Sequence, residues 1–166
     1  VSNNGVLVYL QSEKTDSHFQ LVGRDGRLLE TLAPAAQYDS PVLSRDGKKI
    51  AFTRSGGIWL FDLERGTSTA LTEAASPYVY RASGWSRDDI GVLGCTSGRI
   101  AFQNRAGGPA NIIFNQADFK ETEAASSFKG AKESPDGSFI VFVAWDPVTD
   151  YDLWVLRLDA EPRPQR

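Results

Sequence analysis

The sequence of 166 residues has no methionine, one cysteine and one histidine, and these absences exclude several kinds of site. A single cysteine cannot form an internal disulfide framework. A zinc site needs a cluster of His or Cys ligands, and His18 and Cys95 are the only residues of these types. A nucleophilic serine needs a base, and only His18 is present to serve. We therefore expect no catalytic residue, metal or cofactor, and no enzymatic activity of the chain by itself.

Charge and hydropathy exclude two further classes of partner. The 18 Lys and Arg residues nearly balance the 21 Asp and Glu residues, which leaves a net charge of −3. No basic block is present to neutralise phosphates, so nucleic acid is not an expected partner. No apolar run reaches the ~20 residues that a membrane-spanning helix needs. The chain starts at Val1 and looks like a piece of a longer protein, so we expect membrane attachment only through a missing upstream segment.

A repeat organises the residues that are present. A Ser-x-Asp/Asn-Gly tetrad begins at Ser2, Ser44 and Ser134, and a degenerate copy begins at Ser86; the serines are 42, 42 and 48 residues apart. Asn-Gly and Asp-Gly supply the positive φ that tight turns need. An apolar segment typical of a short buried strand follows each tetrad. These segments are 6–9, 50–52, 90–93 and 139–142.

The repeated unit contains four antiparallel strands in about 42 residues, which is typical of a β-propeller blade. We predict an all-β, single-domain propeller fragment over 1–166, with about three and a half to four blades. The predicted units are 1–40, 41–82, 83–130 and 131–166. Two prolines within 161–166 are expected to break the last strand, because proline donates no N–H to a ladder. An eight-stranded sandwich is the alternative, but it requires no fixed period.

The pattern from Leu43 to Thr72 resembles the TolB-type propeller repeat. It combines Ser44-Arg45-Asp46-Gly47 with Lys49-Ile50-Ala51-Phe52 and Ile58-Trp59-Leu60-Phe61-Asp62-Leu63, and it ends in Leu71-Thr72. The third unit departs from this pattern, because its tetrad lacks the glycine and its second strand lacks the tryptophan. These motifs are specific for the fold rather than for a function.

A narrower resemblance rests on residues 1–9, 20–22, 25–27, 38–41 and 145–156. They look like the C-terminal propeller of bacterial receptor-like serine/threonine kinases. That resemblance implies the sensor-side domain of a larger membrane-bound protein, on the extracytoplasmic (periplasmic) side. The catalytic motifs of a kinase are absent from this chain. Two alternatives stay open: the substrate-gating propeller of a prolyl-oligopeptidase-like hydrolase, and a periplasmic TolB-like protein-interaction module.

Propellers bind through the loops of a rigid disc, so we expect a protein, a peptide or a small ligand on the loop face. The candidate binding residues lie near strand ends and inter-blade connections: Tyr38, Tyr78, Tyr80, Trp85 and Trp145. Trp59 and Trp154 occupy equivalent positions in their units, and we expect both to be buried between blades. The terminal blades are expected to expose unpaired edges, which favours self-association.

Three further features are expected to be structural. Asp146, Asp150 and Asp152 lie close enough together to suggest a calcium loop, but their spacing misses the known pattern and a solvated hairpin loop is the preferred interpretation. Cys95 lies in a small apolar run and is expected to be a buried thiol. His18 is expected to be a solvated loop residue.

Overall fold

The computed structural model describes residues 7–13, 16–72, 79–118, 127–159 and 164–165. Apart from one turn of 3-10 helix at Gln116–Asp118, the regular elements of this part of the chain are strands. They form four antiparallel sheets, which we call blades 1 to 4. The predicted all-β architecture of four-stranded blades is confirmed.

Each blade is a meander in which neighbouring strands pair in chain order. Blade 1 contains β1 (Leu7–Glu13), β2 (Asp16–Val22) and β3 (Leu28–Thr31). Blade 2 contains β4 (Asp39–Leu43), β5 (Lys49–Arg54), β6 (Gly57–Asp62) and β7 (Thr67–Ala70). Blade 3 contains β8 (Arg81–Trp85), β9 (Gly91–Thr96), β10 (Arg99–Asn104) and β11 (Asn111–Asn115). Blade 4 contains β12 (Phe128–Glu133), β13 (Phe139–Asp146), β14 (Asp150–Arg157) and β15 (Pro164–Gln165).

The end of blade 4 corrects one expectation. The prolines were expected to break the last strand, yet β15 pairs with β14 through Val155↔Gln165 and Leu156↔Pro164. This strand is short and lies at the edge of its sheet, where a missing N–H costs little. Proline therefore limits the fourth strand of blade 4 but does not abolish it.

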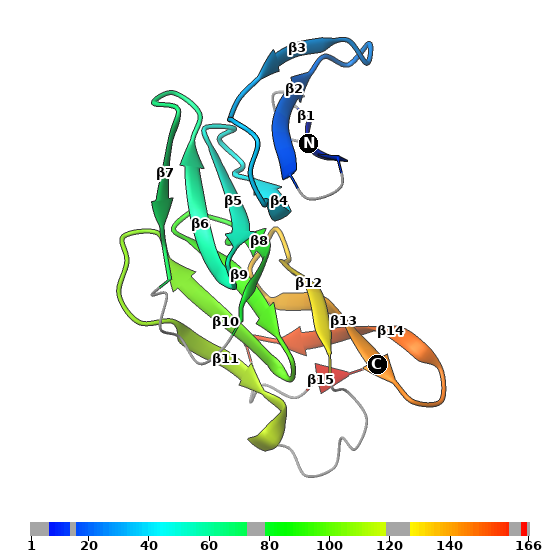
Figure 1. Ribbon diagram of the computed structural model, residues 1–166. Coiled ribbons are helices and arrows are strands. Elements are labelled where there is room, and N and C mark those ends of the chain that lie inside the picture. The colour runs from blue at the N-terminus through cyan, green and yellow to red at the C-terminus, as the bar shows by residue number, and fades with distance from the viewer. Residues whose placement is uncertain (1–6, 14–15, 73–78, 119–126, 160–163, 166) are drawn as a thin grey trace.

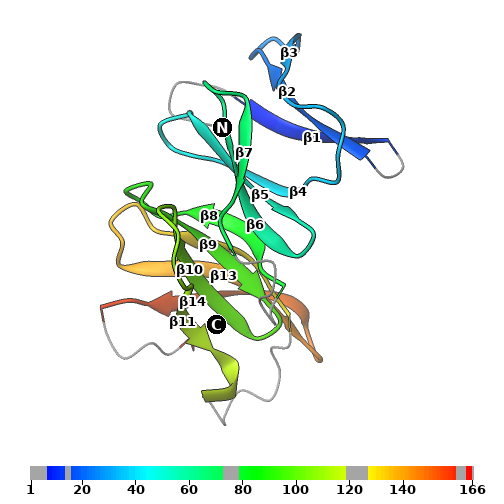
Figure 2. The same ribbon diagram turned by 60° about the vertical axis from the view of Figure 1, so that its left-hand side comes forward.

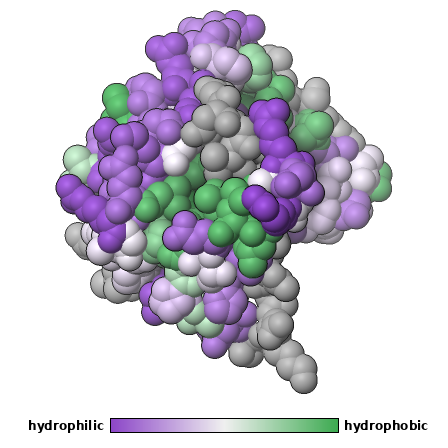
Figure 3. Space-filling model, turned by 90° about the horizontal axis from the view of Figure 1, so that it is seen from above, coloured by the Kyte–Doolittle hydropathy of each residue, from purple (hydrophilic) through white to green (hydrophobic). Residues whose placement is uncertain are grey.

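The four blades follow one another along an arc, with blade 1 at one end and blade 4 at the other (Figures 1 and 2). The first strands β4, β8 and β12 lie towards the middle of the arc and contact one another across the blades, while β3, β7 and β11 lie at its outside. Seen from above, hydrophilic side chains surround a central area of hydrophobic ones (Figure 3). Along the inner side of the arc, β8 contacts β4 of blade 2 and β12 of blade 4.

The predicted tetrads at Ser44, Ser86 and Ser134 form the same hydrogen-bonded turn three times. In the first, the Ser44 hydroxyl donates to the Asp46 carboxylate at 2.6 Å, and the Lys49 amide donates to the Ser44 oxygen at 2.9 Å. The other two turns repeat both contacts. All three serines are buried. The turn thus satisfies a buried hydroxyl and joins the first strand of a blade to the second.

An aromatic residue six positions before each of these serines packs each blade onto the preceding one. These residues are Tyr38, Tyr80 and Phe128, and all three are buried. Tyr38 belongs to the hydrophobic cluster between blades 1 and 2, Tyr80 to the one between blades 2 and 3, and Phe128 to the one between blades 3 and 4. The core of the protein therefore lies between the sheets, in three similar layers.

Candidate binding groove

A groove of about 340 Å³ lies where the innermost strands of blades 2, 3 and 4 meet. Its polar and charged lining comes from all three strands. The lining residues with a charge or a hydroxyl are Ser40 from β4, Arg81 and Ser83 from β8, and Lys129 and Lys132 from β12. Because these strands belong to different blades, only the assembled arc brings the residues together.

The charged side chains that line the groove are all cationic. Arg81 forms an ion pair with Asp39 at 2.6 Å, and Asp39 lies next to the groove on β4. Lys129 donates to the Tyr151 hydroxyl at 2.8 Å, and its ammonium lies 4.3 Å from the centroid of that ring. Among the described residues, neither Lys129 nor Lys132 forms an ion pair. The groove therefore carries uncompensated positive charge on β12.

Lys132 and the Cys95 thiol both line the groove. The Lys132 side chain is exposed at the open side of the groove, yet the protein atoms around the ammonium desolvate it and lower its pKa. The adjacent Cys95 thiol is buried, and burial raises its pKa, so it stays neutral near pH 7.

The sequence analysis missed Arg81, Lys129 and Lys132. A signal was present, because Asp39, Arg81 and Lys129 each come five residues before a tetrad serine. They occupy the same position in three successive blades, and the first two pair with each other. A charged residue repeated at one position of the inner strand indicates a shared surface along the arc.

Three of the predicted binding residues are not at the surface. Tyr38, Tyr80 and Trp85 retain only 4–7% of their accessible surface. The Trp85 indole N–H donates to the Val42 carbonyl at 2.9 Å and so links blade 3 to blade 2. Their placement on an exposed binding face was wrong, because the neighbouring blade covers the connections from which they project.

The other two predicted residues have different outcomes. Tyr78 lies outside the described residues. Trp145 is half-buried near the end of β13, where it pairs across the sheet with Tyr151. Its role in binding stays a prediction.

Comparison with known proteins places this geometry in a known architecture. No family model matches the sequence, and no curated protein matches it. Solved structures do match: TolB from Acinetobacter baumannii superposes with a TM-score of 0.75 at 19% identity, over 97% of this chain and 40% of that chain. The putative TolB from Agrobacterium tumefaciens gives a TM-score of 0.73 at 17% identity, over 99% of this chain and 62% of that one.

The chain has a TolB-like β-propeller fold. A chain of the nidogen/laminin complex also matches, with a TM-score of 0.69 at 13% identity over 96% of this chain and 60% of that chain. The TolB-like propeller described here spans less than two thirds of the length of each of these solved chains. The predicted fold is thus confirmed, whereas these likenesses do not bear on a kinase.

The two tryptophans that the TolB-like repeat places at equivalent positions are equivalent in the structure. Trp59 pairs with Phe52, and Trp154 pairs with Phe142. Both tryptophans are half-buried rather than buried, and each packs against the core between its blade and the preceding one. The expectation of full burial was therefore too strong.

The acidic hairpin between β13 and β14 uses its carboxylates within the loop. Asp146 is buried and accepts the backbone N–H groups of Val148 at 2.8 Å and Thr149 at 3.2 Å. The Thr149 hydroxyl donates to Asp152. Within the described ranges, no group of three or more acidic, His or Cys side chains is arranged to hold a metal ion. The described part of the chain also has no helix long and apolar enough to cross a membrane.

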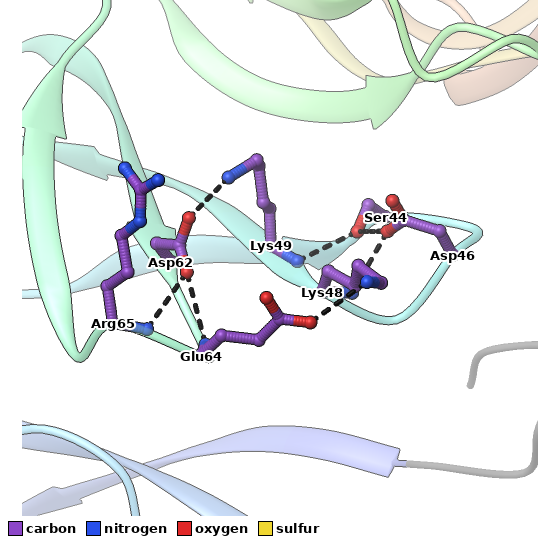
Figure 4. A network of polar contacts seen from close by, with 7 residues as sticks. All are labelled: Ser44, Asp46, Lys48, Lys49, Asp62, Glu64 and Arg65. Carbon is purple, nitrogen blue, oxygen red and sulfur yellow. Dashed lines mark hydrogen bonds and ion pairs between the residues drawn. The ribbon is translucent and has the colours of Figure 1, made fainter.

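The strand connections of blade 2 carry an ion-pair network whose role is structural (Figure 4). Lys49 pairs with Asp62 at 2.6 Å, and Lys48 pairs with Glu64 at 2.9 Å. Asp62 also accepts the backbone N–H groups of Glu64 and Arg65, at 3.1 and 3.0 Å. These contacts lower the pKa of Asp62, chiefly through its hydrogen bond to Lys49. Each carboxylate drawn in Figure 4 interacts with a cation or a backbone amide of blade 2. The network therefore stabilises the connections within one blade.

Proposed function

We propose that the chain is a non-catalytic recognition module that binds an extended acidic segment of a partner polypeptide in the groove between β4, β8 and β12. The observation that carries this proposal is the convergence of Arg81, Lys129 and Lys132 from two adjacent blades on one concave surface. Asp39 offsets Arg81, and the two lysines remain to pair with anionic side chains. A groove of about 340 Å³ is at the small end of ligand sites, which suits one or two side chains of a peptide.

Electrostatic complementarity explains why a rigid propeller would use such a groove. The inner strands are held by three inter-blade cores, so the cations are positioned before the ligand arrives. Arg81, Lys129 and Lys132 are exposed, so solvent and ions screen their attraction to carboxylates. Binding is therefore expected to weaken as salt is added.

Fluorescence anisotropy with a labelled hexaglutamate peptide tests the proposal, and a hexalysine peptide serves as the probe control. We expect the acidic peptide to bind and the basic peptide not to bind. Lys132→Glu and Lys129→Glu should each weaken binding about tenfold, which corresponds to roughly 1.4 kcal/mol. Lys48→Glu is the matched control, because Lys48 is exposed and lies outside the groove. Equal losses in all three variants, or no binding at low salt, would count against the groove.

The absence of catalysis is part of the same proposal. His18 is the one histidine of the sequence and does not line the groove. It was expected to be a solvated loop residue, but it lies within β2 and is half-buried. The purified chain is expected to turn over no peptide, ester or phosphoryl substrate. Turnover that a single substitution abolishes would contradict this expectation.

The narrower resemblance supports a finer proposal about the parent protein. We propose that the chain is the sensor-side domain of a bacterial receptor-like serine/threonine kinase, on the extracytoplasmic side. One observation favours a second candidate, the propeller of a protease: the tricorn protease structure superposes with a TM-score of 0.61 at 11% identity, over 95% of this chain and 17% of that chain. Sequencing the gene around this segment separates them. Kinase catalytic motifs upstream support the first, and a Gly-x-Ser-x-Gly domain downstream supports the second.

A further inference from the structure

A second cavity, of about 500 Å³, lies between blade 2 and the β10–β11 turn of blade 3. Blade 2 contributes residues from β5, β6, β7 and the β6–β7 turn, and blade 3 contributes residues 105–107. Among the described residues, none lines both this cavity and the groove between β4, β8 and β12. We call it the outer cavity. Its lining residues with a charge or a hydroxyl are Lys49, Asp62, Arg65, Thr67, Thr69 and Arg105.

One cation and the carboxylate of the outer cavity neutralise each other. The Lys49 ammonium pairs with Asp62 at 2.6 Å, and Asp62 also accepts the backbone N–H groups of Glu64 and Arg65. These hydrogen bonds, chiefly the one from Lys49, lower the pKa of Asp62, so its carboxylate is ionised at neutral pH. In Figure 4 the Arg65 side chain points to the same side of the strands as this ion pair. Arg65 therefore lies beside a pair that is neutral as a whole.

The other two cations of the outer cavity are not compensated. Arg65 from the β6–β7 turn and Arg105 from the β10–β11 turn are exposed, and neither forms an ion pair with a described residue. The Ser44 hydroxyl, and to a smaller extent Arg105, lower the pKa of Asp46. Asp46 does not line the cavity, and it already accepts the Ser44 hydroxyl at 2.6 Å and the Lys48 amide at 2.9 Å. Three cations and one carboxylate thus leave the lining with an excess of two positive charges.

Hydroxyl and apolar groups complete the lining of the outer cavity. Thr67 and Thr69 are two positions apart on β7, so their side chains lie on the same face of the sheet. A guanidinium offers a planar fork of N–H donors and a threonine hydroxyl offers one O–H donor, which together match the oxygens of a tetrahedral oxyanion. Leu60 and Leu71 form an apolar part of the wall. The cavity therefore suits a ligand with an anionic end and an apolar end.

We propose that the outer cavity binds a small organic phosphate monoester, with its phosphoryl group at Arg65 and Arg105 and its organic part against Leu60 and Leu71. Charge decides between the oxyanions, because a phosphate monoester carries about −1.5 to −2 near pH 7 and so matches the excess of two positive charges. A carboxylate or a sulfate ester carries a single negative charge and would leave one arginine unpaired. Ligand sites typically have volumes of about 300–1,000 Å³, so about 500 Å³ also accommodates a ring attached to the phosphoryl group.

Isothermal titration calorimetry of the full chain with phenyl phosphate, at pH 7.5 and low ionic strength, tests the proposal. Low salt is needed because both arginines are exposed and ions screen their charge. We expect one site per chain, and about tenfold weaker binding in Arg65→Gln and in Arg105→Gln. Arg27→Gln is the matched control and should bind like the wild type, because Arg27 is an exposed arginine of blade 1 that does not line the cavity. No binding by the wild type, or equal losses in all three variants, would overturn the proposal.

Phenyl sulfate tests the class of ligand. It has the same ring and one negative charge, and we expect it to bind about tenfold more weakly than phenyl phosphate. The phosphoryl group takes up a proton below its second pKa of about 6, so phenyl phosphate should lose affinity between pH 7.5 and pH 5. Phenyl sulfate takes up no proton in this range, and its affinity reports any change in the charge of the protein. Equal affinities at pH 7.5, or the same pH dependence for both esters, would overturn the assignment to a phosphate monoester.

The outer cavity and the groove can be tested independently, because they share no described residue. Lys132→Glu should bind phenyl phosphate like the wild type, and Arg65→Gln should bind the hexaglutamate peptide like the wild type. Loss of phenyl phosphate binding in Lys132→Glu, with retention in Arg65→Gln, would place the ester in the groove and overturn the proposal.

Discussion

The ring of Tyr38 in blade 2 stacks on the ring of Phe19 in blade 1, with centroids 4.3 Å apart and an angle of 25° between the planes. Phe19 is fully buried, and it also contacts Phe52 edge-on at a centroid distance of 5.2 Å. The Tyr38 hydroxyl donates to the Pro34 carbonyl at 3.0 Å. One aromatic pair therefore joins the first blade to the rest of the arc.

The first prediction concerns this pair. Phe19→Ala should lower the free energy of unfolding by about 3–5 kcal/mol, because it opens a large cavity between blades 1 and 2. Tyr38→Phe should cost only about 0.5–1.5 kcal/mol, since it keeps the stacked ring and loses one hydrogen bond. Urea denaturation followed by tryptophan fluorescence measures both. Equal losses in the two variants would contradict the larger contribution of the stacked rings.

The second prediction concerns the close approach of blades 3 and 4 at Gly84. A Cβ added at Gly84 would lie 2.7 Å from the Ala131 carbonyl oxygen of β12, which is too close for a backbone atom. Gly84→Ala should therefore push β8 away from β12 and lower the free energy of unfolding by about 1–3 kcal/mol. Ser83→Ala on the same strand adds no atom and loses the hydrogen bond of the Ser83 hydroxyl to the Arg81 carbonyl, so it should cost less. Retention of the wild-type midpoint by Gly84→Ala would contradict the close contact.

The third prediction separates the two equivalent tryptophans. The Trp154 indole N–H is buried and has no hydrogen-bond partner among the described residues. Trp154→Phe removes this unsatisfied donor. The substitution should therefore lower the free energy of unfolding by less than about 1 kcal/mol. Trp59 lies under the Arg54 guanidinium, whose carbon is 5.4 Å from the ring centroid. Trp59→Phe weakens this cation–π contact and should cost more than Trp154→Phe does.

Thermal denaturation of the two Trp→Phe variants side by side measures the difference. Each variant still contains three tryptophans, which keeps the fluorescence signal comparable. The reverse order of stability would show that the Trp154 indole N–H finds a partner that stabilises it.

The fourth prediction concerns the response of the tetrad turns to acid. The Ser134 hydroxyl and the Ser138 N–H and hydroxyl hydrogen-bond the Asp136 carboxylate and lower its pKa to about 2. The hydroxyl of the tetrad serine likewise lowers the pKa of Asp46 and Asp88. A carboxyl whose pKa is lower in the folded state stabilises the fold above its unfolded pKa of about 3.9. That contribution is lost as the pH falls towards about 2.

Urea midpoints measured between pH 6 and pH 2.5 check this prediction. We expect the wild type to lose stability continuously below about pH 4. Asp136→Asn should be less stable than the wild type at pH 6, and its midpoint should depend less on pH. An identical pH dependence in both proteins would remove Asp136 from the acid response.

Contacts between residues that are close in sequence could be predicted in this protein. The tetrads at Ser44, Ser86 and Ser134 were predicted as turns, and their hydrogen bonds join residues that are two to five positions apart. These hydrogen bonds form between residues that are close in sequence, so the residue types alone predict them. The strand order within each blade follows for the same reason, because a meander pairs neighbours.

The candidate site could not be predicted in this way. Arg81 meets Asp39 from another blade, and the two residues are 42 positions apart. Trp85 was interpreted as a surface residue, yet its indole donates to Val42, 43 positions earlier. Whether a side chain at a strand end is exposed depends on the sheet that packs next to it, and the sequence does not state which face that sheet covers.

The repeat and its turn chemistry could be predicted because they depend on residues that are neighbours along the chain, whereas the expectation of a broken last strand was wrong. Which face of each blade is buried depends on how the blades pack together, and it emerges only in the folded chain. Ile58, Ile100 and Leu153 occupy the same register position, and the first two are buried while Leu153 is 68% exposed. The physical reason is that burial is a property of two surfaces, and no described blade packs on blade 4 beyond Leu153.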